Sequence, residues 1–398
     1  MRRSATCLLL LLLAALSGCR QEELVSDNRP ICFAGTSIDV ETRADGSFLS
    51  GGGPLVTGEH FAVYAWNTGA SWLGANPGVP LLMRPVDVTF ANNDDSGTNN
   101  TYPDTGMSSA MDRYWPRSGG AAYDYSFCAY YPYGGAGITA PTFASGVGTF
   151  AFEVQPSAEE MVDFCVSDVA NDIVYGSTNS DYPGTVALGF HHMLTRVQVK
   201  FVKARDVDAD FDIKIWDARL EGVLSTGTLS AGYTPRETPG RALPGTTTFA
   251  WSGRGNRRGY EITLGGEDPG PYASDEADEY KLSLGYTQAV AASDVFLMIP
   301  QTMLSSESGE SAQRIEFWWS AGASTEATHS ILYLDDCLQS IGSSNKADID
   351  WGMGQFVTYT IVIRATPIEF GEFSAEPLVT VSIAPWGEDV EGYVPIFD

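Results

Sequence analysis

The stretch "RVQVKFV" (196–202) has an alternating pattern that indicates the class of fold. Val197, Val199 and Phe201 fall on one side of an extended chain, and the charged and amide side chains between them fall on the other. A period of two residues is typical of a β-strand that buries one face and leaves the other in water. The stretch therefore predicts a half-buried strand.

The same alternation recurs along the chain. Its further instances are the segments 60–66, 86–91, 123–131, 149–154, 211–216, 260–265, 280–286, 295–300, 314–320, 331–335, 357–363 and 378–386. Helical periodicity is nearly absent, and polar, glycine-rich stretches such as 91–106 and 252–261 are expected to be surface loops. Because crossover helices are missing from this pattern, we predict an all-β fold of sandwiches rather than a parallel sheet.

A charged stretch at 202–212 divides the strand-rich chain into two parts of ordinary domain size. We therefore expect an N-terminal β-sandwich domain at 30–205 and a C-terminal β-sandwich domain at 206–398. A lipoprotein signal peptide at 1–18 and a lipidated acidic tether at 19–29 are expected to precede them.

The signal peptide is predicted from its order of residue types. Arg2 and Arg3 precede a leucine-rich run, which ends at "LSGC" with Cys19. The run is too short to span a membrane. Its end resembles the lipobox of bacterial lipoproteins, in which Cys19 becomes the lipid-modified first residue. Acyl chains would then anchor the protein without a spanning helix; the alternative is an ordinary secretory signal that happens to end in cysteine.

An acidic segment follows the predicted lipid site. Gln21, Glu22 and Glu23 resemble the signal by which some Gram-negative anaerobes move lipoproteins to the outer face of the outer membrane. The alternative is a solvated linker. The first interpretation predicts a lipid-anchored, surface-exposed protein of the cell outer membrane.

The charge of the chain excludes one class of partner. Its 398 residues carry 50 acidic and 23 basic side chains, for a net charge of −27. The electric field of a protein with this much negative charge repels nucleic acid, which is itself negatively charged. Hydrophobic residues make up 43% of the chain, which is enough to build a folded core.

No motif for catalysis or metal binding is found in the sequence. Phosphate-binding, zinc-protease, nucleophile-elbow and dinucleotide motifs are all absent, which favours a protein that is not an enzyme and needs no cofactor. His191 and His192 are adjacent, so they point to opposite sides of a strand and cannot share a metal. Asp94 and Asp95 lie in a loop without a clear calcium-ligand spacing. We therefore expect no metal site.

Cysteine and tryptophan residues leave alternatives open. The four remaining cysteines after the signal and lipid site are expected to be buried thiols or to form at most two disulfides: Cys32, Cys128, Cys165 and Cys337. Trp318 and Trp319 are adjacent, so one indole lies on each face of a strand. They are expected to pack in the core or an interface, or to form a platform for sugars.

Three phrases, at 112–133, 162–176 and 185–202, resemble in this order the N-terminal half of fimbrillin-like proteins, the Mfa-like type V pilus components of gut and oral Gram-negative anaerobes. Segments 297–301, 351–363 and 379–386 resemble the C-terminal half. The residues that carry the resemblance in the first half are Tyr114, Trp115, Pro116, Tyr130, Tyr131, Pro132, Asp163, Phe164, Phe190 and His192.

The resemblance implies two tandem transthyretin-like β-sandwich domains and a role as stalk, anchor or tip of a pilus. In polymerising members of the family, an arginine-specific protease removes the first strand, and a strand from a neighbouring subunit fills the groove. In this chain Ile31 and Phe33 lie in the expected first strand, with a change of parity near Gly35 that is typical of a bulge. Arg43 follows and is the candidate processing site, although many fimbrillin-like lipoproteins stay uncut.

The predicted function is that of a non-enzymatic fimbrial subunit or accessory component, which mediates adhesion and assembles by strand exchange. Its expected partners are other pilus subunits, the outer membrane through the lipid, and ligands on host or bacterial surfaces. The alternative is a surface glycan-binding lipoprotein. The first function requires a removable or donated strand, whereas the second requires exposed aromatic side chains.

Overall fold

The computed structural model describes residues 25–37, 60–67, 83–89, 102–103, 114–117, 123–144, 146–175, 185–203, 213–234, 246–265, 280–282, 290–293, 295–321, 326–341, 349–367 and 373–385. Four predicted features lie outside these residues: the signal peptide, the lipid site at Cys19, the acidic segment 21–23 and the candidate processing site at Arg43. The loop that contains Asp94 and Asp95 also lies outside them.

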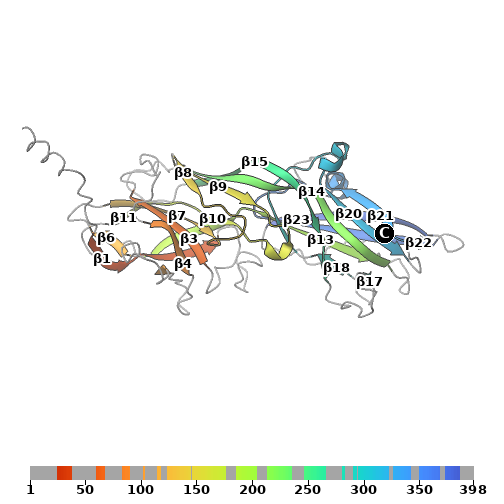
Figure 1. Ribbon diagram of the computed structural model, residues 1–398, viewed down its shortest axis with the longest axis horizontal. Coiled ribbons are helices and arrows are strands. Elements are labelled where there is room, and N and C mark those ends of the chain that lie inside the picture. The colour runs from red at the N-terminus through yellow and green to blue at the C-terminus, as the bar shows by residue number, and fades with distance from the viewer. Residues whose placement is uncertain are drawn as a thin grey trace, which may run out of the picture.

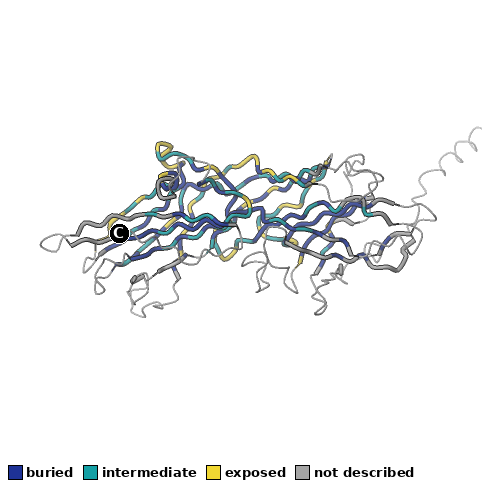
Figure 2. Tube along the Cα trace, turned by 180° about the vertical axis from the view of Figure 1, so that it is seen from behind, coloured by how far each residue is buried: buried dark blue, intermediate teal, exposed yellow. Residues whose placement is uncertain are grey.

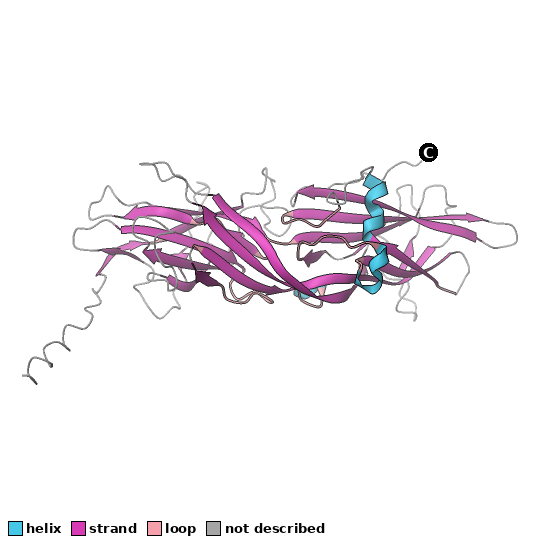
Figure 3. Cartoon of the chain, turned by 90° about the horizontal axis from the view of Figure 1, so that it is seen from above, coloured by secondary structure: helices cyan, strands magenta, loops and turns pink. Residues whose placement is uncertain are grey.

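The molecule is elongated and built almost entirely of strands (Figure 1). Within the described ranges the helical segments are short 3-10 turns at Ala158–Glu160, Ser306–Ser311 and Leu334–Ile341 (Figure 3). None of the described helices is long and apolar enough to cross a bilayer. The prediction of an all-β fold is confirmed.

One end of the molecule holds two sheets. Strands β1 (Val25–Pro30) and β6 (Tyr114–Arg117) form a two-stranded antiparallel sheet. The second sheet has eight strands in the order β2-β12-β10-β7-β3-β4-β5, with β11 paired to β7. Its strands are β2 (Cys32–Ser37), β3 (His60–Asn67), β4 (Met83–Thr89), β5 (Tyr102–Pro103), β7 (Tyr123–Tyr131), β10 (Cys165–Ser167), β11 (Ala170–Tyr175) and β12 (Thr185–His192).

A seven-stranded sheet follows the order β21-β20-β14-β9-β8, with β15 and β17 also paired to β14. Its strands are β8 (Thr142–Ala144), β9 (Val147–Glu153), β14 (Ile213–Thr234), β15 (Thr246–Glu261), β17 (Tyr280–Leu282), β20 (Arg314–Ala321) and β21 (Thr328–Tyr333). A six-stranded sheet follows the order β16-β18-β13-β22-β23, with β19 paired to β13. Its strands are β13 (Thr195–Lys203), β16 (Leu264–Gly265), β18 (Val290–Ser293), β19 (Phe296–Met298), β22 (Gln355–Pro367) and β23 (Phe373–Pro385).

The stretch "RVQVKFV" forms most of β13, in the middle of the six-stranded sheet. Val197, Val199 and Phe201 are fully buried, and the side chains between them are half-buried. β13 pairs in parallel with β22 on one side and antiparallel with β18 and β19 on the other. The prediction of a strand with one buried face is confirmed at this position.

Strand β14 runs through both halves of the molecule (Figure 1). Its first part pairs with β20, and its later part pairs with β9, which ends at Glu153, before the start of β14 at Ile213. One core cluster accordingly extends from Phe150 and Phe152 to Val357 and Tyr359. Buried residues continue through the middle of the molecule in Figure 2. The division into domains at 205/206 stays a prediction, and the pairing of β9 with β14 crosses it.

The prediction of a loop at 252–261 is wrong, because this segment lies within β15 and pairs with β14. Its polar and glycine residues are accommodated by two irregularities in the register. Gly253 and Asn256 there adopt left-handed conformations, with φ of 58° and 48°. Buried Trp251 and Tyr260 hold the segment at both ends. The loop-like composition therefore belongs to a bulged strand.

Candidate functional site

Strand β2 corresponds to the predicted first strand, although β1 precedes it in the chain, and is a terminal strand of the eight-stranded sheet. It pairs in parallel with β12, from Cys32 opposite Thr185 to Ser37 opposite Phe190. Among the described residues no second strand pairs with β2, and the C-terminal strand β23 pairs with β22 in another sheet. The first strand is therefore held to the sheet by one ladder of backbone hydrogen bonds.

Side chains in β2 and just before it are buried in the core. Ile31 and Phe33 have no exposed surface. The ring of Phe33 makes edge-to-face contacts with Phe61 and Phe127, at centroid distances of 6.5 and 5.7 Å. Trp115 of β6 packs on Phe127 in the same way, at 5.7 Å. We call these five residues the first-strand core.

The chain before β2 is also part of the fold. β1 begins at Val25, inside the segment predicted as a tether, and pairs with β6, the strand that carries Trp115. Ile31, expected within the first strand, lies between β1 and β2 and is buried. Ile38 and Val40, on which the predicted change of parity depends, lie outside the described residues.

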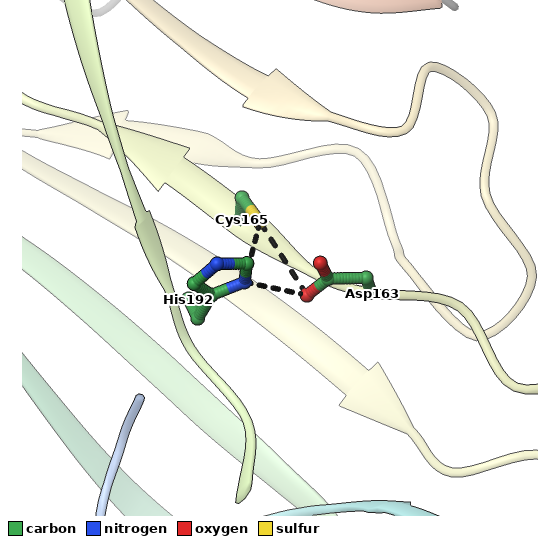
Figure 4. A group of neighbouring side chains, drawn as sticks. All are labelled: Asp163, Cys165 and His192. Atoms are coloured by element: carbon green, nitrogen blue, oxygen red, sulfur yellow. Dashed lines mark hydrogen bonds and ion pairs between the residues drawn. The ribbon is translucent and has the colours of Figure 1, made fainter. Parts of the chain in front are cut away.

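A second candidate site is formed by Asp163, Cys165 and His192 (Figure 4). Cys165 of β10 lies opposite His192, the last residue of β12. Asp163 precedes Cys165 by two residues, so both side chains point the same way. Phe164 between them packs in the core on the other side. Strand pairing thus brings together three polar side chains from distant parts of the sequence.

The three side chains of this cluster are closely spaced and buried. His192 Nδ1 lies 3.0 Å from Asp163 Oδ1 and 3.4 Å from Cys165 Sγ. The Cys165 thiol also lies 3.5 Å from Asp163 Oδ1, to which it can donate. The exposed fractions of Asp163, Cys165 and His192 are 2%, 0% and 1%. The cluster can act as a hydrogen-bonded crosslink between β10 and β12, or as a set of metal ligands.

The three residue types also occur in cysteine hydrolases, but their arrangement here does not suit that chemistry. A nucleophile and an orienting carboxylate must occupy different nitrogens of the histidine ring. In this cluster Asp163 and Cys165 both approach Nδ1. Burial also leaves no room for a substrate to reach Cys165. The cluster therefore does not form a catalytic triad.

The sequence pattern indicated separate contacts for the two adjacent histidines but did not indicate this cluster. His191 contacts Asp168 at 3.1 Å, whereas His192 contacts Asp163, so the adjacent rings make separate contacts as expected. The available signal was an Asp-x-Cys pair on one face of a strand and a histidine in another strand. The sequence did not indicate that the two strands would be neighbours.

Comparison with known proteins places the chain in a family. The model of the fimbrillin-like family matches residues 42–386. The chain belongs to the fimbrillin-like family. The predicted resemblance is therefore confirmed.

Several solved structures resemble this fimbrillin-like protein. A fimbrial protein from Bacteroides vulgatus has 16% identity and a TM-score of 0.47, with 90% of this chain and 100% of that chain covered. A Bacteroides uniformis protein ascribed to cell adhesion has 14% identity and a TM-score of 0.44, covering 90% and 98%. The tip fimbrial protein Mfa3 from Porphyromonas gingivalis has 10% identity and a TM-score of 0.39, covering 90% and 99%. No curated protein matches the chain.

Trp318 and Trp319 of this fimbrillin-like protein both contact side chains of neighbouring strands. Trp319 is buried, and its Nε1 donates to Ser330 Oγ at 3.0 Å. Trp318 is half-buried and stacks on His329 of β21, with ring centroids 4.3 Å apart. The Arg219 guanidinium of β14 lies 5.6 Å from the Trp318 ring centroid. Because β20 runs between β14 and β21, the Trp318 ring has a neighbour on each side.

Three of the four cysteines are buried thiols in the described structure: Cys128, Cys165 and Cys337. Burial raises the pKa of the Cys128 thiol well above its usual range. Burial, followed by the nearby charges of Asp336 and Asp335, raises the pKa of Cys337 to about 12. Cys32 lies in β2. The expectation of buried thiols is therefore confirmed for these three residues.

Proposed function

We propose that this protein is a non-enzymatic, lipid-anchored component of a type V pilus and assembles with other subunits by exchange of its first strand. The observation that carries the proposal is the position of Phe33. It is fully buried, yet it lies in a strand at the end of a sheet, near the N-terminus of the described chain. The predicted processing site at Arg43 follows this strand in the sequence.

Removal of the first strand would leave a binding site for an extended peptide. The backbone of β12 would lose its parallel partner, and the space filled by Ile31 and Phe33 would open onto aromatic side chains. An unpaired edge with an apolar groove is a template for another strand. A strand from a neighbouring subunit with apolar side chains two residues apart would satisfy both the backbone and the groove.

Anchoring is proposed to depend on the N-terminal segment. Lipid at Cys19 would attach the protein to the outer membrane, and the acidic segment 21–23 would direct it to the outer face. These features would place the subunit where a pilus begins. They fit an anchor as well as a stalk or tip component.

An arginine-specific protease tests the exchange. Limited cleavage of the purified protein should release a peptide that ends at Arg43 and should convert monomers into polymers. Arg43→Gln should stay monomeric after the same treatment, and Arg205→Gln, which changes an arginine in the predicted interdomain stretch, should polymerise as the wild type does. A stable monomer at high concentration after release of the leader would contradict strand exchange.

The alternative function, glycan binding, requires an open aromatic platform. Trp319 is buried, and Trp318 lies between His329 and Arg219. Stacking of a sugar on Trp318 would have to displace these neighbours. The geometry therefore supports pilus assembly better than glycan binding.

A further inference from the structure

We propose that Asp163, Cys165 and His192 bind one zinc-like divalent metal ion, which enters the protein as it folds. Each residue offers one ligand atom, and the three atoms lie within 4.8 Å of one another. Thiolate, imidazole and carboxylate are the ligand types that zinc takes in proteins. The three residues come from the β10 region and β12, so the ion would join neighbouring strands.

The spacing of the ligand atoms suits a tetrahedral ion. Zinc binds sulfur at about 2.3 Å and nitrogen or oxygen at about 2.0–2.2 Å, so tetrahedral ligand atoms are separated by about 3.3–3.6 Å. In the cluster the Sγ–Oδ1 and Sγ–Nδ1 distances are 3.5 and 3.4 Å. The Nδ1–Oδ1 distance of 3.0 Å is slightly shorter. The ion could therefore be accommodated by movements of a few tenths of an ångström.

A fourth donor is available within the cluster. Asp163 Oδ2 is buried and has no hydrogen-bond partner among the described residues. A buried carboxylate oxygen without a partner is costly. A carboxylate that binds the ion asymmetrically, with Oδ1 close and Oδ2 more distant, would satisfy this atom and would complete a distorted tetrahedral arrangement with three residues.

The metal-bound site would have no net charge, which is compatible with its burial. One doubly charged cation, the Asp163 carboxylate and the Cys165 thiolate, together with neutral His192, have a net charge of zero. A neutral site avoids the free-energy cost of an uncompensated charge in the core. Calcium and magnesium prefer sets of oxygen ligands and do not suit a thiolate. The chemistry of the three residues thus favours zinc or a similar transition metal.

Proton movements accompany binding. The Cys165 thiol loses its proton to solvent, so one proton is released for each ion bound. Coordination through His192 Nδ1 leaves the imidazole proton on Nε2, and the ring stays neutral. Because all three side chains are at most 2% exposed, the ion must enter during folding or through local opening. This requirement determines how the site is tested.

The probe is cobalt(II), with zinc(II) as the second ion. The full-length protein, purified in detergent, is unfolded in guanidinium under reducing, oxygen-free conditions and refolded with cobalt, with zinc or with a chelator. After removal of unbound ions, we expect one ion per chain by mass spectrometry of the metal. The cobalt form should show a thiolate-to-cobalt charge-transfer band and the intense visible bands of tetrahedral coordination.

Matched variants assign the ligands. Cys165→Ser should lose the charge-transfer band, and Asp163→Asn should retain less metal. Cys128→Ser removes another buried thiol, and His191→Gln removes the adjacent imidazole; both should keep the wild-type spectrum. The refolded wild type should also melt at a higher temperature with zinc than with the chelator.

Either of two results would overturn the proposal. The first is a refolded wild type that retains no ion and shows no thiolate band. The second is a band that persists in Cys165→Ser or disappears in Cys128→Ser, because the metal would then lie elsewhere. If Cys165→Ser does not fold, the loss of metal in Asp163→Asn and the unchanged spectrum of Cys128→Ser decide the question together with the wild-type stoichiometry.

Discussion

Truncation of Phe33 to alanine should release the first strand. Phe33 has no exposed surface and makes two edge-to-face contacts. Replacement of a buried phenylalanine by alanine costs about 3–5 kcal/mol of unfolding free energy. A loss of about 4 kcal/mol changes the equilibrium between paired and released β2 roughly a thousandfold. The effect should concentrate at β2, because one ladder of backbone bonds holds this strand to the sheet.

Hydrogen exchange measured by mass spectrometry is the appropriate assay, because it separates local from global opening. In Phe33→Ala the amides of 32–37 should exchange far faster, while those of β13 keep their protection. Phe317→Ala is the matched control, since Phe317 is equally buried but packs on Phe201 in the other half of the molecule. It should weaken the seven- and six-stranded sheets without selective release of β2.

Unchanged protection of the amides of 32–37 in Phe33→Ala would contradict this prediction. The first strand would then be held by contacts other than the first-strand core. Equal loss of protection throughout the chain would also contradict it, because β2 would unfold only together with the rest of the protein.

Three further predictions concern the N-terminal segment and a buried thiol. Cys19→Ser should abolish lipid attachment, because a hydroxyl cannot form the thioether; palmitate labelling equal to wild type would contradict the lipobox. Simultaneous replacement of Gln21, Glu22 and Glu23 by alanine should keep the protein from the cell surface without affecting its folding, and equal protease shaving of intact cells would remove this inference. Cys337, whose pKa burial raises from 9.0 to about 12, holds its proton more tightly in the folded state than in the unfolded state. The unfolding free energy should therefore fall between about pH 9 and 12, by at most about 1.4 kcal/mol per pH unit for this group. Urea titrations should show a smaller fall in Cys337→Ala, and an identical pH dependence would contradict the prediction.

The strands themselves could be predicted because their signal is local. Successive side chains of an extended chain point to opposite faces. The pattern of a seven-residue stretch is therefore enough to predict the burial of Val197, Val199 and Phe201. The same reasoning identified the segment 123–131 as a strand, which β7 matches in full. The family resemblance was likewise readable, since it depends on the order of short phrases along the chain.

Which strands pair with each other could be seen only in the tertiary structure. β2 lies beside β12 although about 150 residues of chain separate them. Nothing in the alternation of either segment specifies this pairing or its parallel direction. In β15 the local composition gave a wrong prediction. Its glycine-rich sequence indicates a loop, whereas pairing with β14 and the burial of Trp251 and Tyr260 make it a strand.

Local sequence and tertiary structure also contribute separately to the cluster of Asp163, Cys165 and His192. The sequence determined that Asp163 and Cys165 share a face, because they are two residues apart in an extended segment. It could not determine that His192 would lie opposite Cys165, because cross-strand register depends on packing and on chain closure over 27 residues. Side-chain direction is a property of the local backbone, but the encounter of side chains from different strands is a property of the whole fold.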